Sequence, residues 1–248
     1  MLKNKTLANV GWIVIGRIIQ AILSLVIGVF TTRALGPANY GLINYAGSLV
    51  SFCVPLMQLG FDAILVQTFI EEPDYEGETL GTAFMCNVCS GFLCIVGLLV
   101  FCLFVHADEP TTILVCLLYS IRLVFQASES VQYWFQAKLM SKYYTIAMLA
   151  AYGVVSIYKV YLLFTHKSVH WFALSYALDH CLITVILYIV YHRLGTQSLR
   201  FSWKRVLQLL SRSRHYIVSA LVIVLYQQMS ACRAGRASRP RSGCPAGP

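Results

Sequence analysis

Six long apolar runs follow one another along the chain, and short polar segments separate them. A helix that crosses a bilayer needs about 20 consecutive, mostly apolar residues, and each run reaches that length. The predicted spans are residues 10–32, 41–69, 81–105, 111–135, 143–165 and 170–192, and a seventh run starts near residue 215. The pattern therefore predicts an all-α fold, a polytopic membrane helix bundle with six complete transmembrane helices and an interrupted seventh.

The sequence changes character after the seventh run begins. From Ala231 it reads ACRAGRASRPRSGCPAGP, and such an Arg-, Gly- and Pro-rich stretch can neither continue a helix nor build a core. We expect two parts: an N-terminal transmembrane bundle over residues 1–229 and a non-native or disordered tail over residues 230–248. A native tail that is basic and disordered is the alternative.

The overall composition supports a membrane location. Hydrophobic residues make up 58% of the chain and charged residues only 12%, whereas soluble domains average about 25% charged residues. The formal net charge of +9 could indicate nucleic-acid binding, but the Lys and Arg residues lie between the apolar runs, as a topology signal does. We therefore expect membrane lipids as partners and no nucleic acid.

The distribution of basic residues predicts the orientation of the bundle. Basic residues precede the first span and lie between spans four and five and between spans six and seven, which places all three groups on one side. Because Lys and Arg concentrate in cytoplasmic loops, we expect a multi-pass protein with a cytoplasmic N-terminus.

Two further segments fall on that predicted cytoplasmic side. The acidic segment EEPDYEGE, residues 71–78, is expected to be a solvated loop. The basic segment RFSWKRVLQLLSRSRH, residues 200–215, mixes apolar and basic residues and is expected to be an amphipathic helix on the anionic leaflet. A solvated basic loop is the alternative for the second segment.

Several spans carry polar residues on one face, charges among them. A charged residue at the bilayer centre costs about 2.5–3.5 kcal/mol on insertion scales, and residues three or four apart share a helix face. Helices that each present one polar stripe predict a bundle around a water-filled cavity. The candidate cavity residues are Arg17, Gln20, Gln58, Asp62, Arg122, Gln126, Glu129, Lys159 and Asp179. Alternatively, these groups join helices through hydrogen bonds and internal ion pairs.

No motif for catalysis or cofactor binding occurs in the sequence. It has no Walker A, GxSxG or HExxH motif, and the CxxC at Cys86 and Cys89 lacks a second pair of ligands. We therefore expect no enzyme activity, no cofactor and no metal. Without an ATP site, a transporter of this composition has to use an ion gradient or a downhill gradient of its substrate.

The segment between the first two spans is short and specific. It reads RALGPANYG, in which Arg33, Gly36, Pro37 and Gly41 are the characteristic residues. Because Gly-Pro cannot continue a helix, we expect a tight turn that forces the two spans into an antiparallel hairpin on the outer face. The sequence LGFD follows at residues 59–62, near the end of the second span.

These two motifs resemble those of the polysaccharide transporter family, the O-antigen and capsule repeat-unit flippases of the multidrug/oligosaccharidyl-lipid/polysaccharide exporter superfamily. The resemblance is motif-specific over residues 8–67 and extends in hydropathy over residues 1–229. It implies two bundles of six or more helices around a central cavity that opens alternately to each side. It also implies that this chain is about half of such a transporter, in the bacterial plasma (inner) membrane, and inactive alone.

The substrate that the resemblance implies is an undecaprenyl-pyrophosphate-linked oligosaccharide, moved from the cytoplasmic to the outer leaflet. In that case Arg17, Arg122 and Lys159 are candidates to meet the pyrophosphate and sugars. The carboxylates of Asp62, Glu129 and Asp179 are candidate counter-charges or sites for a coupling ion, a proton or sodium. These roles rest on the predicted burial of the charges, because the family offers no universal substrate motif.

Three other functions stay open. A drug/cation antiporter of the same superfamily is one, although the tight turn and the number of cavity charges argue against it. A non-transporting membrane fragment or partner subunit is the second, and the unusual tail favours it. The third is a membrane-embedded enzyme such as a lipid-sugar transferase, for which EEPDYEGE is the candidate acidic cluster.

Overall fold

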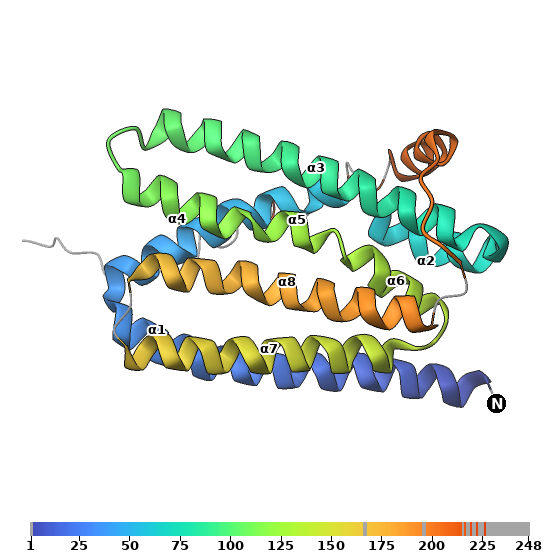
Figure 1. Cartoon of the computed structure of the whole chain (residues 1–248), viewed down its shortest axis with the longest axis horizontal. Helices are drawn as coiled ribbons and strands as arrows, with labels where there is room; N and C mark the ends of the chain where they lie inside the picture. The colour runs from blue at the N-terminus through green and yellow to red at the C-terminus, as the bar shows by residue number, and fades with distance from the viewer. Residues whose placement is uncertain are drawn as a thin grey trace, which may run out of the picture.

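The computed structural model describes residues 2–165, 168–194 and 197–214, together with Tyr216, Ser219, Val222 and Tyr226. The predicted seventh span lies mostly outside the described residues, and the 230–248 tail lies wholly outside them. Helices make up every regular element of the described part, as expected for an all-α fold (Figure 1). The elements are α1 (Leu2–Gln58), α2 (Phe61–Glu71), the short 3₁₀ helix η1 (Pro73–Tyr75), α3 (Glu76–Val105), α4 (Pro110–Ser120), α5 (Arg122–Gln126), α6 (Glu129–Ala137), α7 (Ser141–Phe164) and α8 (Val169–Leu194). Residues 203–214 are also helical.

Helix α1 is two helices joined at a sharp break. Gly36 has φ 74° and ψ 167°, a conformation that essentially only glycine adopts, and Pro37 follows it. The first part of α1 lies beside α7, and the chain then reverses direction and returns toward α2 (Figure 1). The break falls inside the segment predicted to turn, while Gly41 already lies in the helix that follows.

Within the described part of the chain, five helical stretches are long and apolar enough to cross a membrane. They are Asn9–Gln58, Pro73–Val105, Pro110–Ala137, Ser141–Phe164 and Val169–Leu194. The number differs from the predicted six because the first stretch holds most of two predicted spans, 10–32 and 41–69, on either side of Gly36. The second of these spans extends into α2 after another break, where Leu59 and Gly60 both have positive φ.

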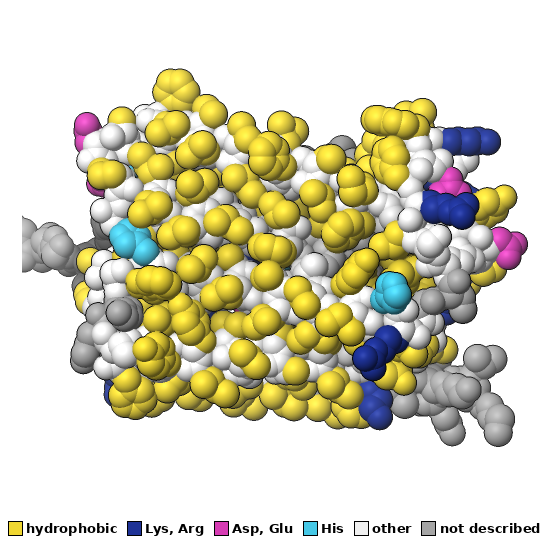
Figure 2. All heavy atoms as spheres, viewed as in Figure 1, with side chains coloured by type: hydrophobic (Ala, Val, Ile, Leu, Met, Phe, Trp, Pro, Cys, Tyr) yellow, Lys and Arg dark blue, Asp and Glu magenta, His cyan; other side chains and the backbone are white. Residues whose placement is uncertain are grey.

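The surface of the bundle is divided along its length. Apolar side chains cover the middle of the face shown in Figure 2, and charged side chains gather at its two ends. Most Lys and Arg side chains in this view lie at the end that carries α2, α6 and the 203–214 helix. This is the surface of a helix bundle whose middle faces hydrocarbon and whose ends face water.

The chain closes the basic end of the bundle by packing residues 197–202 against the start of α3. The Gln197 side chain accepts a hydrogen bond from Gly77 N at 2.9 Å, and Arg200 N donates to Gly77 O at 3.2 Å. A Cβ on Gly81 would lie 2.5 Å from the Arg200 carbonyl oxygen, so only glycine permits this approach. The 197–202 segment and the first turns of α3 are therefore held together through their backbones.

The sequence predicted that the acidic segment 71–78 is a solvated loop, but part of this segment is buried. Glu76 is only 4% exposed at the start of α3, where its carboxylate accepts a hydrogen bond from Trp134 Nε1 at 2.9 Å and pairs with Lys138. A carboxylate at a helix N-terminus also interacts favourably with the helix dipole. The prediction was wrong here because the partners of Glu76 come from α6, about 60 residues along the chain.

We expect Gly81→Ala to lower the stability of the bundle, because its new methyl group meets the Arg200 backbone rather than a side chain that can move aside. Such overpacking typically costs about 1–3 kcal/mol. The measurement is the thermal unfolding midpoint of the purified protein in detergent. Gly97→Ala is the matched control in the same helix, since nothing lies within 4 Å of that position. Equal midpoints for the two variants would contradict the tight approach at Gly81.

Candidate functional site

The charged and polar candidates come from almost every helix of the bundle. Gln126, Lys159 and Asp179 are buried, Arg17 and Asp62 are exposed, and the others are intermediate. Helix α1 carries Arg17, Gln20 and Gln58, α2 carries Asp62, α5 carries Arg122 and Gln126, α6 carries Glu129, α7 carries Lys159, and α8 carries Asp179. Most of these residues gather around Glu129 or around Lys159.

The first group surrounds Glu129 at the start of α6. Gln58 Nε2 donates a hydrogen bond to Glu129 Oε2 at 2.5 Å, which joins the end of α1 to α6. Arg17 and Arg122 both lie within electrostatic reach of this carboxylate. Gln58 and Arg17, which are distant from Glu129 in the sequence, and Arg122 therefore converge on one negative charge.

The second group surrounds Lys159. The lysine is 4% exposed, and its ammonium lies 3.9 Å from the centre of the Tyr176 ring. An aromatic face attracts a cation and does so more strongly when water is excluded. Asp179, 6% exposed on α8, lies within electrostatic reach of the same ammonium. A buried lysine is thus held by an aromatic face and a nearby carboxylate.

Arg122 connects the two groups. Its guanidinium donates to the Tyr119 hydroxyl at 3.2 Å, and the Tyr119 and Tyr176 rings lie 4.8 Å apart. The same guanidinium acts electrostatically on both Glu129 and Asp179. We call the six charges Arg17, Asp62, Arg122, Glu129, Lys159 and Asp179 the charged seam. Its three cations and three anions sum to zero.

The charged seam retains unused hydrogen-bonding capacity. Arg122 Nε, Gln126 Oε1 and Asp179 Oδ1 are buried and have no hydrogen-bond partner among the residues that the structure describes. A buried polar atom without a partner costs about 1–3 kcal/mol, so these atoms favour the presence of water, an ion or a substrate group. None of the nine candidates lines the pockets described below, and a shared cavity stays a prediction.

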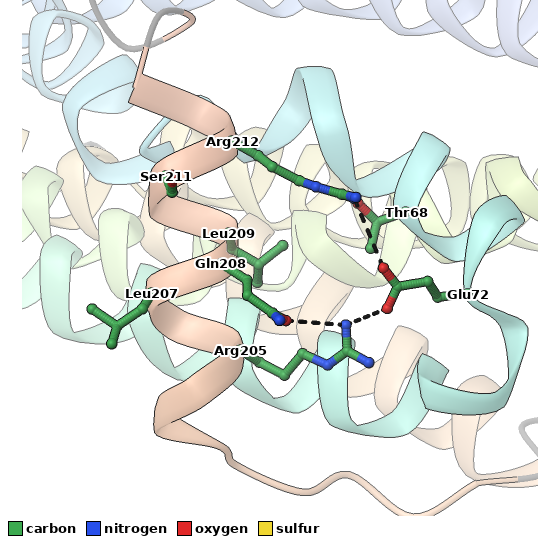
Figure 3. Close-up of a pocket in the computed structure, with 8 residues that line it drawn as sticks. All are labelled: Thr68, Glu72, Arg205, Leu207, Gln208, Leu209, Ser211 and Arg212. Atoms are coloured by element: carbon green, nitrogen blue, oxygen red, sulfur yellow. Dashed lines mark hydrogen bonds and ion pairs between the residues drawn. The ribbon is translucent and has the colours of Figure 1, made fainter.

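A pocket of about 410 Å³ opens at the basic end, between α2 and the 203–214 helix. Arg205 and Arg212 reach across it from the 203–214 helix toward Glu72 (Figure 3). Arg205 forms an ion pair with Glu72, and Arg212 NH1 lies 3.5 Å from Glu71 Oε2. The pocket is lined by Thr68, Glu72, Arg205, Leu207, Gln208, Leu209, Ser211 and Arg212. Acidic residues at the end of α2 thus bind basic residues more than 130 positions later.

The helix predicted near residues 200–215 is present, but only some of its apolar side chains are buried, and others are exposed. Val206 and Leu209 are buried against the bundle, whereas Trp203 is 73% and Leu207 68% exposed. The sequence predicted a helix on the lipid surface, and the ion pairs of this helix with Glu71 and Glu72 were not predicted. The opposite charges of the 71–78 and 200–215 segments could have indicated these ion pairs.

Among the residues that the structure describes, no group of three or more His, Cys, Asp or Glu side chains is arranged to hold a metal ion. Cys86 and Cys89 are free thiols on successive turns of α3. The chemistry of this interior is that of charge pairing and hydrogen bonding.

Comparison with known proteins gives the family. Neither the curated proteins nor the solved structures contain a match to this chain. A family model described as "Polysaccharide biosynthesis protein" matches residues 6–242, nearly the whole chain. Members of that family are membrane transporters, in agreement with the apolar helices and the buried charges described above. The chain therefore belongs to the polysaccharide biosynthesis protein family, the polysaccharide and O-antigen flippases of the multidrug/oligosaccharidyl-lipid/polysaccharide exporter superfamily, and is a multi-pass membrane protein.

Proposed function

We propose that this chain forms the N-terminal bundle of a flippase in the bacterial plasma membrane. The flippase moves undecaprenyl-pyrophosphate-linked oligosaccharide repeat units from the cytoplasmic to the outer leaflet for surface polysaccharide synthesis. The observation that carries the proposal is the inner part of the charged seam, where the Arg122 guanidinium lies within electrostatic reach of Glu129, Lys159 and Asp179 in a bundle of this family. The concentration of Lys and Arg at one end supports a cytoplasmic N-terminus.

The chemistry of the seam suits such a substrate. A pyrophosphate carries negative charge that hydrocarbon cannot solvate, and a guanidinium presents planar donors that match phosphate oxygens. No described residue accepts a hydrogen bond from the buried Nε of Arg122, so this atom retains a donor for a substrate oxygen. Gln126 and Asp179 offer free acceptors for sugar hydroxyls, and Asp179 and Glu129 are candidate sites for a coupling proton or sodium ion.

The exposed position of Arg17 supports a second bundle in the working transporter. Arg17 is exposed within an apolar stretch of α1, and it donates a hydrogen bond to Gln20 on the same helix, at 3.5 Å. Leaving a cation against lipid is costly. We propose that a further bundle, or a second copy of this one, packs there and completes the cavity.

We expect Arg122→Gln to reduce flipping by about 10- to 100-fold at unchanged protein level, because a hydrogen bond to a charged group is worth about 1.5–3 kcal/mol. The measurement is delivery of the lipid-linked repeat unit to the outer leaflet in cells that depend on this transporter. Lys204→Gln removes an exposed cation outside the seam and should transport normally.

Two outcomes would count against the proposal. Flipping at the normal rate by the Arg122→Gln variant would remove Arg122 from the substrate path. Efflux of a cationic dye by the unmodified protein, without delivery of the lipid-linked sugar, would instead favour the drug/cation antiporter.

We also propose that the ion pairs between α2 and the 203–214 helix hold this helix on the bundle. Glu72→Arg places a third cation beside Arg205 and Arg212 and should detach the helix, whereas Glu72→Arg combined with Arg205→Glu restores an opposite-charge pair. Labelling of a Cys introduced at the buried position Leu209 by a water-soluble maleimide measures the detachment. We expect labelling to rise at least threefold in the single variant and to return toward the starting level in the double variant. Equal labelling in all three backgrounds would show that apolar packing alone holds the helix.

A further inference from the structure

An apolar groove opens on the side of the bundle between α3, α6 and α8. Its volume is about 240 Å³, somewhat below the range of about 300–1,000 Å³ that is typical of pockets for small molecules. It therefore suits a narrow chain better than a group of sugar rings. Its lining includes Ser128, Thr184, Val185, Tyr188, Ile189 and Leu199.

The polar atoms of the groove are already satisfied by the protein. The Thr184 hydroxyl lies 2.9 Å from the Phe125 carbonyl oxygen and 3.0 Å from Ser128 Oγ. The outer wall is formed by Val185, Tyr188 and Ile189, each about half exposed. The groove therefore requires neither water nor a polar ligand, and in a bilayer its exposed wall faces hydrocarbon chains.

One end of the groove is basic. His192 lies one turn beyond Tyr188, with the two rings 6.4 Å apart, and Arg193 lies one turn beyond Ile189. Arg200 follows Leu199, which lines the same end. Both arginines are exposed, and no carboxylate among the described residues pairs with either. Figure 2 shows Lys, Arg and His side chains gathered at this end of the apolar face.

We propose that this groove binds one acyl chain of an anionic phospholipid, whose phosphate lies at Arg193 and Arg200. The distance along α8 fits such a lipid. From Val185 to Arg193 the helix rises about 12 Å at 1.5 Å per residue, close to the roughly 15 Å of hydrocarbon in one leaflet. The phospholipid belongs to the leaflet on the basic side of the bundle. This inference does not depend on the identity of the transported substrate.

Photolabelling of the whole protein in nanodiscs tests the site. The probe is a phosphatidylglycerol with a diazirine on its acyl chain, and labelled residues are located by mass spectrometry of peptides. We expect labelling on α8 around Val185–Ile189, with competition by unlabelled phosphatidylglycerol and little competition by phosphatidylcholine. Equal competition by both lipids would overturn the proposal, because it would show only general contact with the bilayer.

Two sets of variants test separately whether the groove and the basic residues at its end contribute to lipid binding. Val185→Trp fills the groove and should lower labelling at least fivefold, whereas Leu178→Trp places the same side chain at an exposed position of α8 outside it. Equal labelling in these two variants would overturn the assignment of the groove. Arg193→Gln and Arg200→Gln should each weaken labelling about fivefold, as expected for one basic residue near an anionic headgroup, and Lys142→Gln should not.

The arginine variants keep the test informative if Val185→Trp fails to fold, since both side chains are exposed. Unchanged phosphatidylglycerol labelling in the variant without both arginines would overturn the headgroup assignment. Stronger labelling by a photoreactive polyprenyl phosphate than by phosphatidylglycerol would overturn the choice of a phospholipid and identify an isoprenoid chain as the occupant.

Discussion

The cost of placing a charge in hydrocarbon governs this structure more than any other constraint. No water is available in the bilayer core to solvate a guanidinium, an ammonium or a carboxylate. The bundle meets this cost by bringing opposite charges together from different helices and by placing Lys159 over an aromatic ring. The helices that carry these charges are thereby fixed in relation to one another, even though lipid exerts no hydrophobic force between them.

The same constraint explains how much of the fold could be predicted from the sequence. Apolar runs of membrane length identified the helices, because a backbone in hydrocarbon must satisfy its own hydrogen bonds. The Gly36–Pro37 pair marked the reversal of α1, because its conformation is a local property of those residues. The number of separate helical stretches could not be predicted from the apolar runs. Two predicted spans form one nearly continuous helical stretch, because the helix resumes directly after the break at Gly36.

Contacts between side chains that are distant in the sequence could not be predicted. A polar stripe identifies a helix face but not the helix that it meets, so the pairing of Gln58 with Glu129 was not predicted. The acidic 71–78 segment looked solvated because its partners lie in α6 and beyond residue 196. The groove between α3, α6 and α8 is likewise a product of packing, and its lining residues read as ordinary apolar positions in the sequence.

The close approach at Gly77 and Gly81 has a mechanical consequence. At these two positions the backbone of α3 meets the 197–202 segment directly, through the hydrogen bond from Arg200 N to Gly77 O and the close approach of Gly81 to the Arg200 backbone. A pull on the 203–214 helix is therefore passed directly into α3, and through Glu76 into α6. We therefore expect these parts to move together, and the nearest points where the helical backbone is interrupted are Gly36 and Leu59–Gly60.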